Sequence, residues 1–216
     1  MGFFEANKKG MIQPHDNVHV VTLQITEFDA KMVMIEQGSR IEIMYPNLFK
    51  GLGHKFEDLS KYDVPLVGFD GKTIVPRGMI RLLIQMGEEV VNADFIMVEA
   101  YSPYMAILAR PWLHALGAVS LTLHVKLKYP TEGGVGELLG CQAVARQCMV
   151  AAIRHQASKI SSSKSTPTYS NQCPSCQPPR ILQYHVSVWI RLPLLKMRRG
   201  TSKLCNINLM SELHQV

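Results

Sequence analysis

A short apolar run that ends in an acidic residue at a glycine turn limits the fold of this chain more than any other feature. Residues 32–35 (Met-Val-Met-Ile) are followed by Glu36, then by Gly38, and then by a second apolar stretch at 41–44. A β-strand that ends in this way can present its carboxylate at the mouth of a cleft, and Gly38 allows a positive φ and a close backbone approach. Alone, such a turn is most often a solvated strand end, so its meaning depends on the rest of the chain.

Segments on both sides of this turn also favour short β-strands. Residues 28–30 are interpreted as a turn, and residues 119–128, which alternate apolar and polar side chains most clearly, predict a last strand. The other expected strands are 18–25, 31–35, 79–85 and 90–99, the last two separated by a turn at 86–89. The chain is therefore predicted to be mainly β.

Glycine and proline mark the connections between these strands. Asp70-Gly71 lies between two β-prone runs and predicts a hairpin, because both central positions of a type I′ turn need a positive φ. Residues 46–53 predict a short helical turn closed by glycines, and Pro111 predicts the first turn of a short helix. Residues 141–155 change to a helical period and predict a short C-terminal helix.

Charge and composition divide the chain near residue 156. Residues 1–150 carry a net charge of −2 and residues 151–216 a net charge of +8, so the net positive charge of the chain comes from its C-terminal part. After residue 156 the chain is rich in Ser and Pro and poor in apolar residues, which predicts a disordered tail. The predicted organisation is an N-terminal arm (1–16), a folded domain (17–130), an extension with a helix (131–156) and a basic low-complexity tail (157–216).

Several protein classes are disfavoured by the same composition. The five cysteines are odd in number and irregularly spaced, unlike a secreted disulfide framework. No apolar stretch approaches the ~18 residues of a membrane span, and the first ten residues lack the core of a signal peptide. An intracellular protein, by default cytoplasmic and without a membrane partner, is expected.

Three segments, in this order and spacing, resemble one known family. They are residues 36–39 (Glu-Gln-Gly-Ser), 66–71 (Leu-Val-Gly-Phe-Asp-Gly) and 106–113 (Ala-Ile-Leu-Ala-Arg-Pro-Trp-Leu). Over roughly residues 12–155 the chain resembles the retropepsin-like aspartic protease domain of plant gypsy-type LTR retrotransposon gag-pol polyproteins, in a degenerate and truncated copy. The resemblance implies an acid-protease (retropepsin-like) barrel that hydrolyses peptide bonds of a polypeptide substrate.

The resemblance also implies roles for residues and a homodimer. In this family two carboxylates share a proton, so that one acts as base and the other as acid on an attacking water. The chain has a single such turn, so the second carboxylate would come from a second copy. The expected catalytic residues are Glu36, Gly38 and Ser39, while the substrate-binding residues are the flap tip (Phe69, Asp70, Gly71) and the late motif (Ala109, Arg110).

The chain departs from the family pattern at three of these positions. Glu36 stands where the family has Asp, and a displacement of about an ångström can cost on the order of 10²-fold in rate. Gln37 replaces a small hydroxyl residue that makes cross-dimer hydrogen bonds, and Ala109 replaces a glycine. Catalysis is therefore expected to be impaired, and the first alternative is a catalytically inactive module that dimerises or binds a peptide by strand addition.

The C-terminal part offers two weaker signals. Its basic residues suggest association with nucleic acid as a second alternative. Cys173 and Cys176 have the spacing of metal ligands, but Ile181 stands where a zinc knuckle needs His. No metal and no cofactor is therefore expected.

Overall fold

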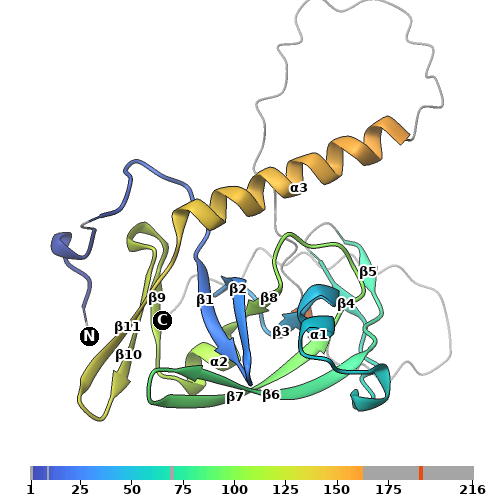
Figure 1. Cartoon of the computed structure of the whole chain (residues 1–216), viewed down its shortest axis with the longest axis horizontal. Coiled ribbons are helices and arrows are strands. Elements are labelled where there is room, and N and C mark those ends of the chain that lie inside the picture. The colour runs from blue at the N-terminus through green and yellow to red at the C-terminus, as the bar shows by residue number, and fades with distance from the viewer. Residues whose placement is uncertain (1, 9, 69–70, 163–189, 192–216) are drawn as a thin grey trace, which may run out of the picture.

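Six strands close into a barrel that forms the centre of the molecule (Figure 1). The computed structural model describes residues 2–8, 10–68, 71–162 and 190–191. Around the barrel the order is β1-β2-β8-β3-β7-β6. The strands are β1 (Val20–Ile25), β2 (Phe28–Ile35), β3 (Glu42–Met44), β6 (Gly78–Met86), β7 (Glu89–Met97) and β8 (Ala106–Leu108). With the helix described below, this confirms the prediction of a mainly β barrel followed by a C-terminal helix.

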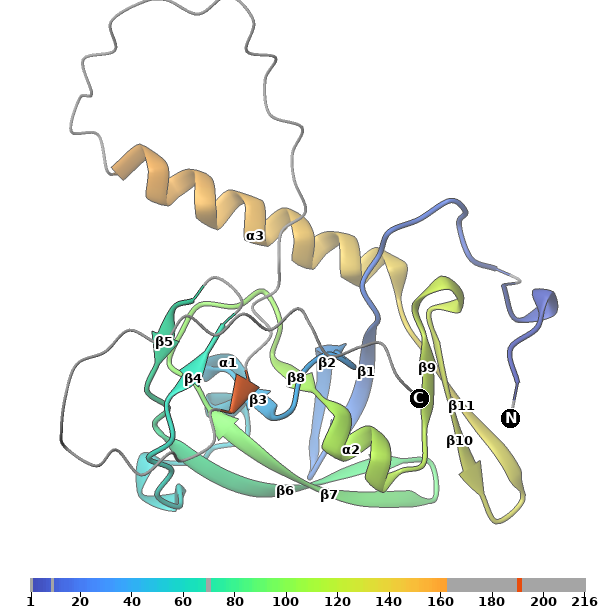
Figure 2. The ribbon, with the colours of Figure 1, turned by 180° about the vertical axis from the view of Figure 1, so that it is seen from behind.

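Among the residues described above, two small sheets and three α-helices surround the barrel (Figure 2). One sheet has the order β12-β4-β5, with β4 at Leu66–Val67, β5 at Thr73–Ile74 and β12 at Ile190–Arg191. The other has the order β11-β10-β9, with β9 at Val119–Leu121, β10 at Lys126–Thr131 and β11 at Gly134–Leu139. The α-helices are α1 (Pro46–Gly51), α2 (Arg110–Ala115) and α3 (Gln142–Ser162), and the 3₁₀ turns are Glu5–Lys8, Phe56–Asp58 and Thr122–His124. Within the described residues, no helix has both the length and the apolar character needed to cross a membrane.

The short strands β3 and β8 lie between two antiparallel hairpins and pair with them in parallel. The hairpins β1–β2 and β6–β7 are local, whereas β2 pairs with β8 in parallel and β3 pairs with β7 in parallel. β3 and β8 are three residues each and buried throughout. This agrees with parallel strands that are covered on both faces.

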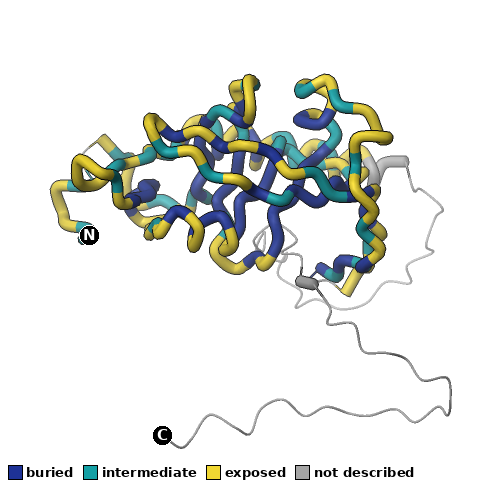
Figure 3. Tube along the Cα trace, turned by 90° about the horizontal axis from the view of Figure 1, so that it is seen from below, coloured by how far each residue is buried: buried dark blue, intermediate teal, exposed yellow. Residues whose placement is uncertain are grey.

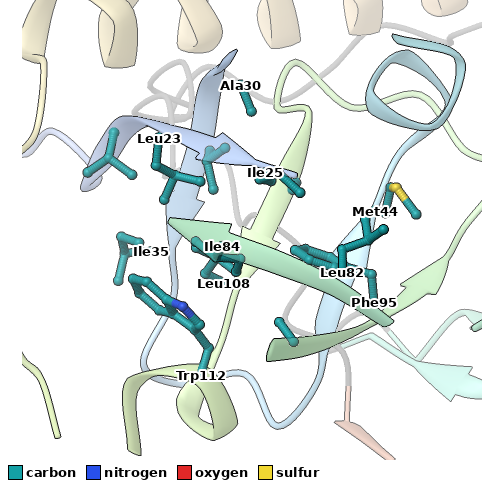
Figure 4. Packing of buried hydrophobic residues seen from close by; sticks show 14 of the residues in the cluster. Leu23, Ile25, Ala30, Ile35, Met44, Leu82, Ile84, Phe95, Leu108 and Trp112 are labelled. Carbon is teal, nitrogen blue, oxygen red and sulfur yellow. The ribbon is translucent and has the colours of Figure 1, made fainter. Parts of the chain in front are cut away.

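Side chains from all six strands fill the barrel. Figure 4 shows Ile35, Leu108 and Trp112 in this core, with Trp112 reaching in from α2. Trp112 is 1% exposed, and burial of a side chain of that size contributes strongly to the stability of a core. In Figure 3 the buried residues gather in the interior of the molecule, and exposed residues surround them.

The turn predicted at residues 28–30 was wrong. These residues form the start of β2, and Ile25 pairs directly with Phe28. The reversal therefore takes place at Thr26 and Glu27, where Thr26 has a φ of 56°. A two-residue hairpin needs such left-handed backbone, and no glycine or asparagine marks the position in the sequence.

The single strand predicted over 119–128 was also wrong. β9 ends at Leu121, a 3₁₀ turn follows, and Val125 takes a left-handed conformation with a φ of 46° before β10 begins. The chain thus folds back on itself, with Lys126 opposite Leu121. Strand β11, which follows β10, was not predicted, because two glycines interrupt its apolar pattern.

The C-terminal helix exists but is longer than predicted. α3 spans 21 residues and continues to Ser162, past the boundary predicted after residue 156. The remainder of the predicted tail, apart from β12, lies outside the described residues. Of the other predicted elements, the strands at 18–25, 79–85 and 90–99 and the helical segments at 46–53 and Pro111 are found.

Candidate active site

Glu36 is the first residue after β2, at the point where that strand leaves the barrel. Its backbone N–H donates to the carbonyl of Leu108 at 2.8 Å and thereby extends the parallel ladder between β2 and β8 by one residue. The side chain is half-buried, whereas Ile35 before it is 5% exposed. The predicted position of this carboxylate, at the end of a strand, is confirmed.

The turn after Glu36 is closed by its own side chain. The N–H of Gly38 donates to Glu36 Oε1 at 2.8 Å, and the N–H of Ser39 donates to the Glu36 carbonyl at 3.2 Å. The expected positive φ at Gly38 is not found, although Gly53 and Gly71 have one. The Glu36 side chain thus folds back over the turn.

Arg110 fastens this turn to the start of α2. Its backbone N–H and its side-chain Nε both donate to the Ser39 carbonyl, each at 3.2 Å. The Ser39 side chain is 1% exposed and donates to the Ile41 carbonyl at 3.1 Å. Ala109 is fully buried with extended backbone just before the helix, so its methyl group is accommodated at this position. The structure therefore brings Glu36, Gly38, Ser39, Ala109 and Arg110 together.

A second carboxylate, not predicted to have a role, stabilises the same region from inside. Glu42 on β3 is 4% exposed, and its Oε1 accepts the backbone N–H of Trp112 at 2.9 Å. Burial raises the pKa of Glu42 above its usual value, more than the N–H of Trp112 lowers it. In the sequence its only signal is a lone carboxylate inside the apolar stretch 41–44.

Gln37 is held within its own chain rather than left free for a partner. Its side-chain amide donates to the carbonyl of Ser120 on β9. The Ser120 hydroxyl lies 2.8 Å from Nδ1 of His19, which is 1% exposed. Burial lowers the pKa of His19 to about 4, so the ring is neutral at pH 7. This connection was not predicted, because nothing in the local sequence pairs position 37 with position 120.

The predicted flap is an antiparallel hairpin formed by β4 and β5. Gly71 has the expected positive φ, 76°, and the predicted hairpin is found. Val67 pairs with Thr73 and the Gly71 N–H donates to the Gly68 carbonyl at 3.0 Å, so the reversal is longer than the two-residue turn predicted at Asp70-Gly71. Phe69 and Asp70 lie outside the described residues. The base of the hairpin packs in a buried cluster that also contains Met34 and Ile107 from the two strands behind Glu36. Across the described residues, no hydrogen bond joins Gly71 to the Glu36 turn.

The remaining predictions fall largely outside the described residues. Cys173, Cys176 and most of the basic tail are not described, so the predicted nucleic-acid association stays a prediction. Within the described ranges, no three His, Cys, Asp or Glu side chains gather in a way that could hold a metal ion.

Comparisons with known proteins found similarity among solved structures alone. No family model matches it, and no curated protein matches it. Among solved structures, it is similar to the retroviral protease-like domain of Ddi1 from Leishmania major, with 12% identity and a TM-score of 0.46 over 59% of this chain and 96% of that one. It is also similar to the EIAV protease complexed with the inhibitor HBY-793, with 14% identity and a TM-score of 0.40 over 49% and 94% of the two chains. A retropepsin-like aspartic protease from Rickettsia conorii has 14% identity and a TM-score of 0.37 over 55% and 79%.

Proposed function

We propose that this chain is a retropepsin-like aspartic endopeptidase domain whose acid dyad forms from Glu36 of two copies. The observation that carries the proposal is the position of Glu36, half-buried at the end of a barrel strand with its turn bonded to Leu108 and Arg110. A carboxylate held in this way on a rigid strand end can be presented to a substrate. The sequence resemblance supports an origin in a gypsy-type retrotransposon gag-pol polyprotein.

In the proposed reaction the two carboxylates share one proton, because like charges at short distance cannot both ionise. The ionised carboxylate removes a proton from water, and the resulting hydroxide attacks the peptide carbonyl carbon. As the tetrahedral gem-diol forms, the protonated carboxyl donates its proton to the carbonyl oxygen. When the gem-diol collapses, the carboxyl that took the water proton donates it to the amide nitrogen, the other carboxylate takes a proton from a diol hydroxyl, and the C–N bond breaks to give an acid and an amine. The hairpin of β4 and β5 would cover an extended substrate.

The additional methylene of Glu36 lowers the expected rate. Oε1 is engaged by the Gly38 N–H within the same turn, so the two copies must place the carboxylates through longer side chains. Positional errors of about an ångström can cost on the order of 10²-fold. The alternative, a catalytically inactive dimerisation or peptide-binding module, is favoured by this substitution and by Gln37, whose amide is bonded to Ser120 of its own chain.

The test compares the native protein with Glu36→Asp and Glu36→Gln on a mixed peptide library near pH 5. Glu88→Gln is the matched control, because Glu88 is exposed in the β6–β7 turn and undergoes the same chemical change. We expect weak cleavage by the native protein and by the control, none by Glu36→Gln, and an increase on the order of 10²-fold for Glu36→Asp. If no variant cleaves although all are folded and dimeric, the endopeptidase proposal fails and the binding module is favoured.

A further inference from the structure

The outer edge of β11 is an unpaired strand edge. β11 is the last strand of its sheet, and the two-residue reversal between Thr131 and Gly134 determines which backbone groups face β10. Residues 134, 136 and 138 bond inward, as does Gly140, whose N–H donates to the Val125 carbonyl at 2.8 Å. The N–H and C=O groups of Val135, Glu137 and Leu139 therefore point away from the sheet. In the part of the chain that the structure describes, no backbone group bonds to them.

The side chains of the same three residues lie on the outer face of the sheet. Residues directly opposite each other share a face, so Glu137 lies beside Lys128 and Leu139 beside Lys126. The inner face carries Leu127 and Tyr129, which belong to the barrel core. Val135 and Leu139 are 51% and 56% exposed. The edge thus offers two exposed apolar side chains on either side of one acid.

Charged side chains are one of the features that keep edge strands from pairing, but the charge on this edge is already neutralised. Glu137 is held by Lys126 Nζ at 2.6 Å and by Lys128 Nζ at 3.2 Å, and these lysines lower its pKa. The N-terminal segment lies over Lys128, whose Nζ donates to the Gly2 carbonyl at 2.9 Å. This segment leaves Val135 and Leu139 exposed. The other edges of the small sheets are shorter, since β9 has three residues and β5 and β12 have two each.

We propose that β11 pairs with β11 of a second copy, antiparallel about a two-fold axis at Glu137. This register is the one that pairs all three outward-facing residues with one another. Glu137 faces Glu137 of the second copy, and Val135 faces Leu139 in both directions. Each pair exchanges two N–H···O bonds. The two glutamates at the axis are surrounded by the lysines of both copies, and the Val–Leu pairs bury the exposed apolar side chains.

This interface is separate from the dimer of the proposed function and does not rest on it. Gln37, beside Glu36, donates a hydrogen bond to Ser120 on β9, and β9 is the edge strand opposite β11 in the same sheet. Pairing through β11 places the two β9 strands five strand spacings apart, about 24 Å. The β11 interface therefore leaves the Glu36 turns apart.

Cysteine cross-linking of the full chain tests the register. In the proposed pair the Cα atoms of residue 137 lie about 5.5 Å apart, a separation that suits a disulfide. We expect Glu137→Cys to give a covalent dimer on mild oxidation, with a 137–137 linkage identified by peptide mass spectrometry. Glu132→Cys is the matched control, because position 132 lies at the far end of the hairpin, about 34 Å from its counterpart in this register. Linkage at position 132, or none at 137, overturns the proposal.

Sedimentation tests whether the β11 edges of the native protein drive its association into a dimer. Val135→Lys should weaken the dimer roughly tenfold or more by placing a cation at both ends of the paired strands. Val119→Lys is the control, because Val119 is 48% exposed on the same face but on β9. Glu36→Gln should leave this dimer unchanged, which separates the outcome from that of the proteolysis experiment. The proposal is overturned if the native protein is a monomer, which is the result expected if a peptide or the chain's own C-terminal residues occupy the edge of β11. It is also overturned if Val135→Lys does not weaken the dimer.

Discussion

Removal of the Glu42 carboxylate should destabilise the frame that holds the Glu36 turn. Glu42 is 4% exposed and accepts the Trp112 N–H at 2.9 Å. In Glu42→Ala this buried donor loses its partner, which costs about 1–3 kcal/mol. For a chain of this size each kcal/mol corresponds to about 2–4 °C in melting temperature. We therefore expect a decrease of roughly 2–12 °C at pH 7.

Glu42→Gln separates the hydrogen bond from the buried charge. Gln keeps an oxygen for the Trp112 N–H and carries no charge to desolvate. Because the folded-state pKa of Glu42 is raised, the stability that this group contributes is fully present below its unfolded pKa and is lost as the pH rises through its folded pKa. Relative to the native protein, Glu42→Gln should therefore gain stability from acid to neutral pH.

Tryptophan fluorescence during urea or thermal unfolding measures both effects. Trp112 is 1% exposed and reports directly on the region around Glu42, and Trp189→Phe removes the other indole of the chain. The reasoning would be refuted if Glu42→Ala melted at the native temperature, or if the Ala and Gln variants were equally destabilised at neutral pH.

Two further predictions concern the surroundings of the site. Burial lowers the pKa of His19 from 6.5 to about 4. The free energy of unfolding should therefore fall by on the order of 3 kcal/mol as the pH drops through this range. Urea titrations should show a much smaller fall for His19→Gln, and an equal fall in both proteins would contradict the lowered pKa of His19. A Cβ at Gly136 would overlap the Tyr129 ring, whereas one at Gly133 meets open space. In thermal melts Gly136→Ala should therefore lower the stability by about 1–3 kcal/mol, and Gly133→Ala should leave it almost unchanged. Equal melting temperatures of the two variants would argue against this packing.

Much of the fold could be predicted because its signals are local. The hairpin at Gly71 and the strands 79–85 and 90–99 have turn residues or β-prone runs that can be recognised within a short window. The turn that carries Glu36 was found in the same way, as an apolar strand that ends in a carboxylate. Its neighbours Ala109 and Arg110 came from the family resemblance rather than from the pattern.

The features that were missed depend on contacts between distant residues or on unfavourable backbone. Val125 adopts a positive φ, which is rare for a β-branched residue, so the pattern around it indicated one strand where there are two. Glu42 meets Trp112, and Gln37 meets Ser120, only after the chain has folded. The members of the two pairs are 70 and 83 residues apart, so no short window of the sequence contains both members of either pair.

The parallel pairing of β2 with β8 determines when the Glu36 turn can form during folding. The hairpins β1–β2 and β6–β7 join neighbouring segments and can form early, but Val33 pairs with Ala106, and Glu36 bonds to Leu108. Long-range pairing is slow, because a large loop must close first. On a ribosome, the motif that contains Glu36 is made early, yet its support is made only when β8 and Arg110 have emerged. A chain that terminates before residue 106 would carry the motif without the site.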